Sequence, residues 1–342
     1  MTAERPDQNR PQLAPSMAEL LGGAAEREPF GDGAGKSGAE LARVTIDGEP
    51  FVVKYLDLAE DWTMRCAGVL RGVPLELWLR AVLARLPACF NQPIVGVAVD
   101  STAGGHDGRT ALLMRDVGAW LVPVTDAPVP LAQHVSFLDH MAALHAEFWE
   151  DGGDIDVVPP MHRYLELSPW TAAAEAAIGS AALVPRLVAQ GWPLLAEVAP
   201  VAAQVVLPLA WDPGPLVAAL AVTPQTFVHG NWKLDNLGTD PEGRTVLLDW
   251  ESSGRGAAAS DLAWYLAINC RRLPQSKEES ILTYRAALER HGIATAGWWD
   301  TQLALCLLGA LVQFGWEKAL GGYDAELAWW EARALEAAPL LA

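Results

Sequence analysis

Four polar residues between positions 231 and 249 have the side-chain types that phosphate chemistry needs. Asn231, Lys233 and Asn236 occur together in the segment HGNWKLDN. Asp249 follows the apolar run VLL. Carboxylate and amide oxygens are the hard ligands that Mg²⁺ prefers, and a metal ion with a lysine can neutralise the charge that spreads over a transferring phosphoryl group. The set therefore predicts a magnesium site that handles a phosphoryl group.

The elements around these residues are predicted to bring them together. Residues 226–250 read as a short β insert, in which the turn Asp240-Pro241-Glu242-Gly243 joins two opposed segments. The run VLLDWE ends a hydrophobic strand with an acid, and a strand end presents such a carboxylate to solvent or to a metal. We therefore expect Asn236 and Asp249 to face each other across the insert.

HGNWKLDN followed by LLDWE resembles the catalytic motifs of the aminoglycoside phosphotransferase and choline kinase-like family. It also resembles the His-Arg-Asp-x-Lys-x-x-Asn loop of protein kinases. The resemblance implies that His229 anchors the loop, that Asn231 occupies the position of the catalytic base, and that Lys233 reaches the transferring phosphate. A lone HGN would be a weak signal, but the match is clustered over residues 227–275.

The same resemblance implies a metal site, a brace and a fold. Asn236 and Asp249 would hold Mg²⁺, and Asp261 in SDLAWYL resembles the helix aspartate that braces the catalytic loop. The implied fold is the bilobal protein kinase-like fold of class α+β. The expected organisation is a disordered tail over residues 1–15, a small and mostly β nucleotide-binding lobe over 16–118, and a larger helical lobe over 119–342.

Lys54 in FVVKYL matches the strand lysine that pairs with the α- and β-phosphates of ATP. Taken alone it reads more often as an ordinary lysine on an amphipathic strand. The family places a glutamate partner for this lysine on the next helix. Glu76 is the first candidate for that partner, and Glu60 is the alternative.

Two further segments resemble nucleotide-binding parts of the family. GAGKSGAEL resembles the β-turn that covers the phosphates, with Ser37 and Gly38 at its tip. It is not a Walker A loop, because that motif requires a glycine where this chain has Phe30. MRDV would be the hinge strand whose backbone, at Arg115 and Val117, binds adenine. ATP and GTP both remain open as the nucleotide, because such hinge contacts are mostly to backbone.

Apolar periodicity and turn residues predict the other elements. Alternation in LARVTI and FVVKYL around Asp47-Gly48 predicts a β-hairpin. Strands are expected at 93–100 and 110–117, and helices at 17–26, 74–85 and 131–149. The helices over 171–220 are expected to be broken by prolines, and the tail over 260–338 to be helical. These prolines are Pro185, Pro193, Pro200 and Pro208.

Composition predicts an acidic protein of the cytoplasm. The formal net charge is −18, which repels nucleic acid and anionic membrane and would favour a cationic ligand. An acidic surface that only keeps soluble molecules apart is the more frequent explanation. The four cysteines form no CxxC pair, so thiols in a reducing compartment are expected. The start of the sequence has no apolar signal region, and its longest apolar run, 303–314, is too short for a membrane span.

Histidines and tryptophans offer weaker alternatives. His134, His140 and His145 share one predicted helix, but their spacings differ from the i, i+4 pair typical of a metal site, so core or surface histidines are expected. The 15 tryptophans could form an aromatic cage for an ammonium group. Packing of a large helical core is the favoured interpretation.

Asn231 decides how far the resemblance extends to activity. A positioned general base contributes a factor of about 10² to 10⁴ in rate, and an amide can orient a hydroxyl without accepting its proton. Asp235 is the nearest acid along the chain, although the loop would have to turn it toward the substrate. Phosphoryl transfer has a loose transition state and depends less on a base, so slow turnover is conceivable.

Three functions fit this sequence. The first is a kinase that uses Mg²⁺ and ATP and acts on a hydroxyl of a small polar molecule, in the class of amino sugars and aminocyclitols. The second is a pseudokinase that binds a nucleotide or a partner, and the third is a kinase scaffold recruited to another ligand. Asn231 introduced deliberately to trap a substrate complex would fit as well. We favour the kinase, because a site freed from ATP has no physical need of Lys54, Lys233, Asn236 and Asp249.

Overall fold

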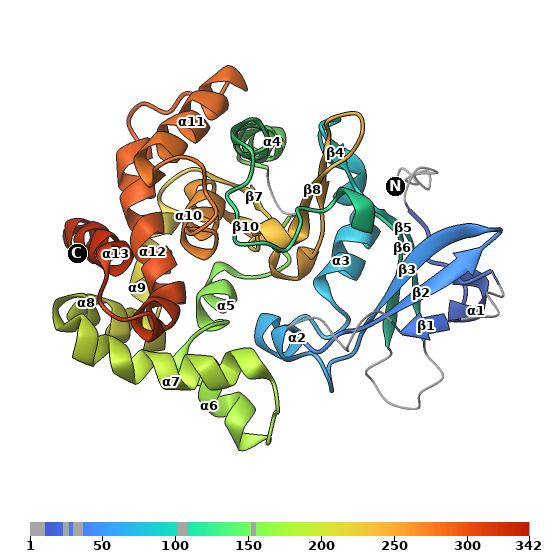
Figure 1. Ribbon diagram of the computed structural model, residues 1–342, viewed down its shortest axis with the longest axis horizontal. Helices are drawn as coiled ribbons and strands as arrows, with labels where there is room; N and C mark the ends of the chain where they lie inside the picture. Colours follow the sequence, from blue (N-terminus) through green and yellow to red (C-terminus); the bar gives the residue numbers. More distant parts are fainter. Residues whose placement is uncertain (1–10, 23–26, 30–36, 101–108, 152–154, 342) are drawn as a thin grey trace, which may run out of the picture.

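The computed structural model describes residues 11–22, 27–29, 37–100, 109–151 and 155–341. Over these residues the chain forms a β-rich N-terminal part and a larger helical C-terminal part (Figure 1). The mixed α+β class predicted from the sequence is confirmed.

The N-terminal part is built on an antiparallel sheet of strand order β1-β2-β3-β6-β5. The hairpin between β2 and β3 turns at Asp47 and Gly48, whose φ angles of 52° and 85° are both positive. Two positive φ angles are typical of a type I′ turn, which Asp-Gly favours. The strand bounds are β1 (Arg27–Pro29), β2 (Glu40–Ile46), β3 (Glu49–Leu56), β5 (Ile94–Val99) and β6 (Thr110–Arg115).

Short helices accompany this sheet, and two expectations about them need correction. The helix expected over 74–85 ends early: α3 (Val73–Leu79) stops before Ala81, whose φ of 56° is left-handed, and a 3₁₀ turn, η1 (Leu83–Arg85), follows. The helix expected over 17–26 is α1 (Met17–Leu20), and positions 23–26 lie outside the described residues. The third helix is α2 (Trp62–Ala67).

The expected N-terminal tail is also shorter than predicted. Trp78 Nε1 donates to the carbonyl of Gln12 at 3.2 Å, and Ala14 N–H donates to the carbonyl of Val97 in β5 at 2.9 Å. Positions 11–15 therefore pack against the sheet and α3. Positions 1–10 of the expected tail lie outside the described residues.

The C-terminal part is a bundle in which α12 is central. Figure 1 shows α12 surrounded by α7, α10 and α13. By length and composition α12 could cross a membrane, but most of its apolar window is buried inside the protein, as in the core helix of a globular fold. The helices are α4 (Leu131–Glu147), α5 (Pro160–Leu165), α6 (Pro169–Ala177), α7 (Leu183–Val198), α8 (Pro200–Trp211), α9 (Gly214–Ala221), α10 (Ala259–Ile268), α11 (Lys277–Arg290), α12 (Trp299–Leu320), α13 (Ala325–Ala337) and the 3₁₀ turn η5 (Ala338–Leu341).

The expectation that prolines break the helices over 171–220 is correct only at Pro200, which begins α8. Pro185 lies in the first turns of α7, and Pro193 and Pro208 lie inside α7 and α8. Both interior prolines are exposed. Water can therefore solvate the carbonyls that lose a helical hydrogen bond there.

The predicted β insert lies between α9 and α10. Strand β7 (Gln225–Val228) pairs antiparallel with β10 (Gly254–Ala257), and β8 (Leu237–Thr239) pairs antiparallel with β9 (Thr245–Leu247). Strand β4 (Phe90–Asn91), which precedes β5 in the chain, pairs in parallel with β9. Two 3₁₀ turns hold the polar residues of the insert in place. Asn236 ends η3 (Leu234–Asn236), and Asp249 directly precedes η4 (Trp250–Ser252).

Candidate active site

Asp261 of α10 holds the loop that follows β7. Its carboxylate is fully buried and accepts from the backbone N–H groups of His229, at 2.7 Å, and Gly230, at 2.8 Å. His145 Nε2 lies 3.1 Å from the same carboxylate. Burial opposes ionisation, but the hydrogen bond from His145 and the backbone donors hold the pKa of Asp261 below its usual value. The spacing of the histidines along α4 did not identify His145 in this role.

Gly230 allows this close approach of loop and strand. Its φ is 75°, and a Cβ there would lie 2.4 Å from the carbonyl oxygen of Ser252. No other residue type adopts this backbone with that space available.

His229 connects the loop to the strand that carries Asp249. Its Nε2 lies 2.9 Å from the carbonyl oxygen of Leu248, and the Asn231 N–H donates to its Nδ1 at 3.2 Å. These partners require the neutral ring with its hydrogen on Nε2. Burial lowers the pKa of His229, which favours the same neutral form. The ring packs edge-on against Trp250 and Trp232.

The structure brings Asn231, Asn236 and Asp249 together, as their spacing predicted. Asn231 Nδ2 donates to Asp249 Oδ2 at 2.8 Å. Asn236 Nδ2 donates to the carbonyl of Asn231 at 3.1 Å and lies 3.5 Å from Asp249 Oδ2. Asp249 has a left-handed φ of 68°, a strained conformation that occurs preferentially at functional sites. An amide therefore contacts the acid directly at the position expected for a catalytic base.

Lys54 reaches the same acid from β3. Its Nζ donates to Asp249 Oδ1 at 2.7 Å and also contacts Glu251 Oε1. Burial lowers the pKa of Lys54, but the two carboxylates outweigh that effect and raise it. Burial also disfavours ionisation of Asp249, whose pKa is nevertheless held well below its usual value by Lys54 and Lys233.

The expected pairing of Lys54 with Glu76 is replaced by its pairing with Glu251. Glu76 Oε2 instead lies 3.4 Å from Nη2 of Arg80, which follows one helical turn later at the end of α3. Both side chains are partly exposed. Glu251 stands two residues after Asp249 in VLLDWE, and that short spacing is the signal that sequence reasoning missed. Burial and the neighbouring Asp249 raise the pKa of Glu251.

A small cavity of about 20 Å³ opens beside this ion-pair cluster. Charged residues, Lys54, Asp249 and Glu251, line it together with apolar ones that include Ile94 and Met114. Small-molecule sites combine apolar walls with a few charged groups in this way, and a volume of this size holds about one water molecule rather than a nucleotide.

The expected hinge residues lie next to this cavity, directly after Met114. The Arg115 N–H donates to the carbonyl of Pro93 at 3.0 Å, and its guanidinium donates to Asn91 at 2.5 Å. Val117 is buried, and its carbonyl accepts from Trp120 N–H at 2.9 Å.

The described end of the expected phosphate turn rests on the start of α2. The Trp62 N–H donates to the carbonyl of Ser37 at 3.2 Å. Gly38 has a φ of 99°, and a Cβ there would lie 2.5 Å from the carbonyl of Glu60. Positions 33–36 of the segment GAGKSGAEL lie outside the described residues.

The donor set around Asp249 fits a divalent cation of the Mg²⁺ class. It offers an ionised carboxylate and the amide oxygen of Asn236, with Glu251 Oε2 buried and without a hydrogen-bond partner in the described structure. Over the described residues, the surroundings of Asp249 included, no group of three or more His, Cys, Asp or Glu side chains is arranged to hold a metal. Lys233 Nζ forms no ion pair with any described residue, and its charge acts on Asp249 and Glu166 without direct contact.

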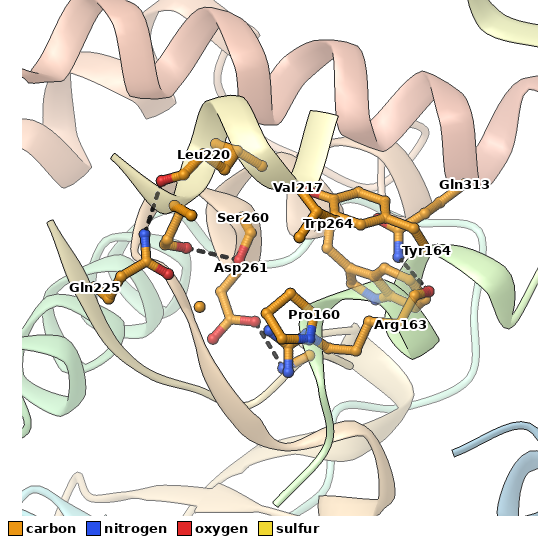
Figure 2. A pocket seen from close by; sticks show the side chains of 14 residues that line it. Pro160, Arg163, Tyr164, Val217, Leu220, Gln225, Ser260, Asp261, Trp264 and Gln313 are labelled. Carbon is orange, nitrogen blue, oxygen red and sulfur yellow. Dashed lines mark hydrogen bonds between the residues drawn. The ribbon is translucent and has the colours of Figure 1, made fainter. Parts of the chain in front are cut away.

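A second cavity, of about 60 Å³, lies behind the loop (Figure 2). Arg163 of α5, Asp261 and Gln313 of α12 are on its wall. Arg163 is buried and donates to the carbonyls of Val158, at 2.9 Å, and Arg255. The guanidinium thereby fixes β10, and sequence reasoning did not identify this residue.

His134 and His145 of α4 are buried and His140 is half-buried, in agreement with the expected core or surface histidines. His134 lies 2.9 Å from the hydroxyl of Tyr265, and His140 lies 2.7 Å from that of Thr245. Several tryptophans, including Trp232, Trp250 and Trp330, are fully buried, which supports the interpretation that they pack the core.

Replacing Asp261 by alanine should destabilise the chain by about 3 kcal/mol, because two buried N–H groups and His145 lose their acceptor. Chemical denaturation with a linear extrapolation measures the loss. Asp261→Asn, which keeps one acceptor oxygen, is the matched control and should lose less. Equal stability of the alanine variant and the unchanged chain would show that Asp261 is not the brace.

A family model described as "Phosphotransferase enzyme family" matches residues 37–298. No curated protein matches the chain. Among solved structures, choline kinase LicA from Streptococcus pneumoniae is similar at 12% identity, over 95% of each chain, with a TM-score of 0.51. The microcompartment-associated aminopropanol kinase is similar at 12% identity, over 95% of this chain and 94% of that one, with a TM-score of 0.50. These similarities confirm the predicted bilobal kinase-like fold.

Proposed function

Because the chain belongs to the phosphotransferase enzyme family, we propose that it transfers the γ-phosphate of ATP to a hydroxyl of a small polar molecule. The observation that carries the proposal is the meeting of Lys54 from β3 with Asp249 and Asn236 of the β insert in one cluster. Buried charges are retained at a stability cost when they serve a ligand. GTP is the alternative nucleotide, because the hinge contacts to the base are mostly to backbone.

We assign the roles in this reaction from the contacts. Lys54 would bind the α- and β-phosphates, and Asn236 with Asp249 would hold Mg²⁺, which supplies charge neutralisation to the phosphates when bound. Lys233 would contact the transferring phosphate. Asn231 would orient the acceptor hydroxyl, and His229 with Asp261 would fix the loop. In this proposal residues 16–118 form the nucleotide lobe and 119–342 the substrate lobe.

The acceptor we propose is cationic or polar. The net charge of −18 favours a cation over an anion near the protein. Similar kinases named for choline and aminopropanol, together with amino sugars and aminocyclitols, define the panel of acceptors to test. The unpaired state of all four cysteines agrees with the reducing cytoplasm in which we place the protein.

A pseudokinase is the second candidate, and one contact favours it. The hydrogen bond from Asn231 to Asp249 satisfies an oxygen that a metal ion would otherwise take. If this bond persists in solution, nucleotide would bind without Mg²⁺ or not at all.

ATP titrated into the protein by calorimetry should bind with Mg²⁺ and bind much more weakly with EDTA. Lys54→Met is the control, because it removes the phosphate contact and leaves the cavity wall apolar. Equal affinity with and without Mg²⁺ would favour the pseudokinase. Absence of nucleotide binding in both conditions would contradict the proposed function.

A further inference from the structure

Glu166 follows the C-terminal end of α5 and lies beside the candidate active site. Its Oε2 accepts a hydrogen bond from the Ser252 hydroxyl at 3.2 Å. Ser252 ends η4, the turn that starts directly after Asp249. Helix α5 also packs against α2 and β10. The carboxylate therefore lies between the two parts of the chain, next to the segment that carries Asp249.

The other nearby carboxylates already have partners or face away. Asp249 and Glu251 both pair with Lys54. Asp61 caps α2, where its Oδ1 accepts from the N–H groups of Thr63 and Met64. Asp235 is exposed. Asp61 Oδ2 is buried and has no hydrogen-bond partner in the described structure, but its Oδ1 is held by the cap of α2. Glu166 forms no ion pair with any residue that the structure describes, so no cation fixes its carboxylate.

The surroundings of Glu166 favour a group that exchanges a proton near neutral pH. Burial raises the pKa of Glu166 to about 7, while the hydrogen bond from Ser252 and the charge of Lys233 act in the opposite direction. The negative charges of Asp249 and Asp61 contribute to this raised pKa. A general base works best when its pKa lies close to the working pH.

Arg163 and Cys66 also interact electrostatically with this carboxylate, from α5 and α2. Arg163 is engaged with two backbone carbonyls. Burial raises the pKa of Cys66 to about 12, so that thiol stays neutral beside it.

We propose that Glu166 is the proton acceptor that compensates for the amide at position 231, an inference that rests on the proposed function. The acceptor hydroxyl would give its proton to the Glu166 carboxylate as its oxygen bonds to the γ-phosphorus. The bond from that phosphorus to the β–γ bridging oxygen breaks, and ADP leaves with the electron pair. Asn231 orients the hydroxyl, and Glu166 takes the proton.

The variant Glu166→Gln tests this role with the acceptor of highest turnover in the panel above, or with water as acceptor in ATP hydrolysis. We expect kcat to fall by about 100-fold, the lower end for loss of a general base, while calorimetry shows unchanged MgATP affinity. Glu197→Gln, an exposed glutamate of α7, is the matched control and should retain full activity.

The pH profile separates a base from a structural brace. The base acts in its deprotonated form, so kcat/KM of the unchanged chain should rise with pH through about 7, the pKa of Glu166, and Glu166→Gln should lose that limb. Ser252→Ala removes the hydrogen bond to Glu166 and should move the limb to higher pH.

The double variant Glu166→Gln/Asn231→Asp completes the test, because an aspartate at position 231 supplies a new base. Restored turnover supports the proposal. Unchanged turnover and pH profile in Glu166→Gln would overturn it, as would a loss that Asn231→Asp does not restore. A chain that binds no MgATP overturns the proposed function as well, and calorimetry on the same samples distinguishes that case.

Discussion

We expect Asn231→Asp to raise turnover at least tenfold, because a carboxylate accepts the proton that an amide cannot. A positioned base contributes a factor of about 10² to 10⁴, and the smaller gain reflects the proton acceptor already proposed at Glu166. Steady-state release of ADP with the acceptor panel measures it. The gain should be larger in the Glu166→Gln background than in the unchanged chain.

The same substitution should weaken the chain when no metal is bound. Asn231 Nδ2 donates to Asp249 Oδ2 at 2.8 Å, and an aspartate would replace this donor by a second carboxylate at hydrogen-bond distance. Like charges so close oppose joint ionisation. Mg²⁺ would relieve the repulsion, so we expect a lower unfolding midpoint in EDTA and a midpoint close to that of the unchanged chain in MgATP.

Asn231→Ala is the matched control for this prediction. It also frees Asp249 from the amide but adds no base, so MgATP should bind at least as well while turnover stays low. Absence of any gain in Asn231→Asp, across amino sugars, aminocyclitols and amino alcohols, would count against the kinase and favour the pseudokinase.

The part of the site that sequence could predict is local. Asn231 and Asn236 share one loop, and Asp249 follows after a turn that is predicted from Asp240 and Gly243. The loop and the strand are too short to place these residues far apart. Their spacing along the chain was therefore enough to predict that the three side chains lie close together. The direct hydrogen bond between Asn231 and Asp249 depends on side-chain rotamers, which the spacing does not define.

The contacts that sequence could not predict join distant segments. Lys54 pairs with Glu251, 197 positions away along the chain, rather than with Glu76 on α3. The family pattern named a helix glutamate, but α3 ends at Leu79 and its Glu76 contacts Arg80. A residue of this kind can be found only after the two parts of the chain are placed against each other.

The fold shows the same division between local and distant signals. Strong alternation and an Asp-Gly turn predicted the β2–β3 hairpin with its turn residues. The parallel pairing of β4 with β9 was not predictable, because β4 has two residues and its partner lies in the insert. The helices through Pro193 and Pro208 persist because tertiary packing outweighs the local preference of proline, and both rings face solvent.

Asp249→Ala has the largest effect that we expect, a loss of Mg²⁺-dependent nucleotide binding and of measurable turnover. Asp249 is the ionised oxygen ligand of the proposed metal site. Without it the site keeps the neutral amide of Asn236 and a Glu251 carboxylate that is paired with Lys54. Without the metal, the charge on the phosphates is left to Lys54 and Lys233. ATP titrated by calorimetry should therefore show one weak affinity, the same with Mg²⁺ and with EDTA.

The fold should survive this change, which makes the result interpretable. Lys54 keeps Glu251 as a partner, so no buried ammonium is left unpaired, and removal of the adjacent negative charge should lower the pKa of Glu251. A thermal midpoint close to that of the unchanged chain verifies this. Asp249→Asn keeps the shape without the charge and should also lose the Mg²⁺ dependence. If either variant still binds ATP more tightly with Mg²⁺, the metal is held elsewhere and the assignment of Asp249 is wrong.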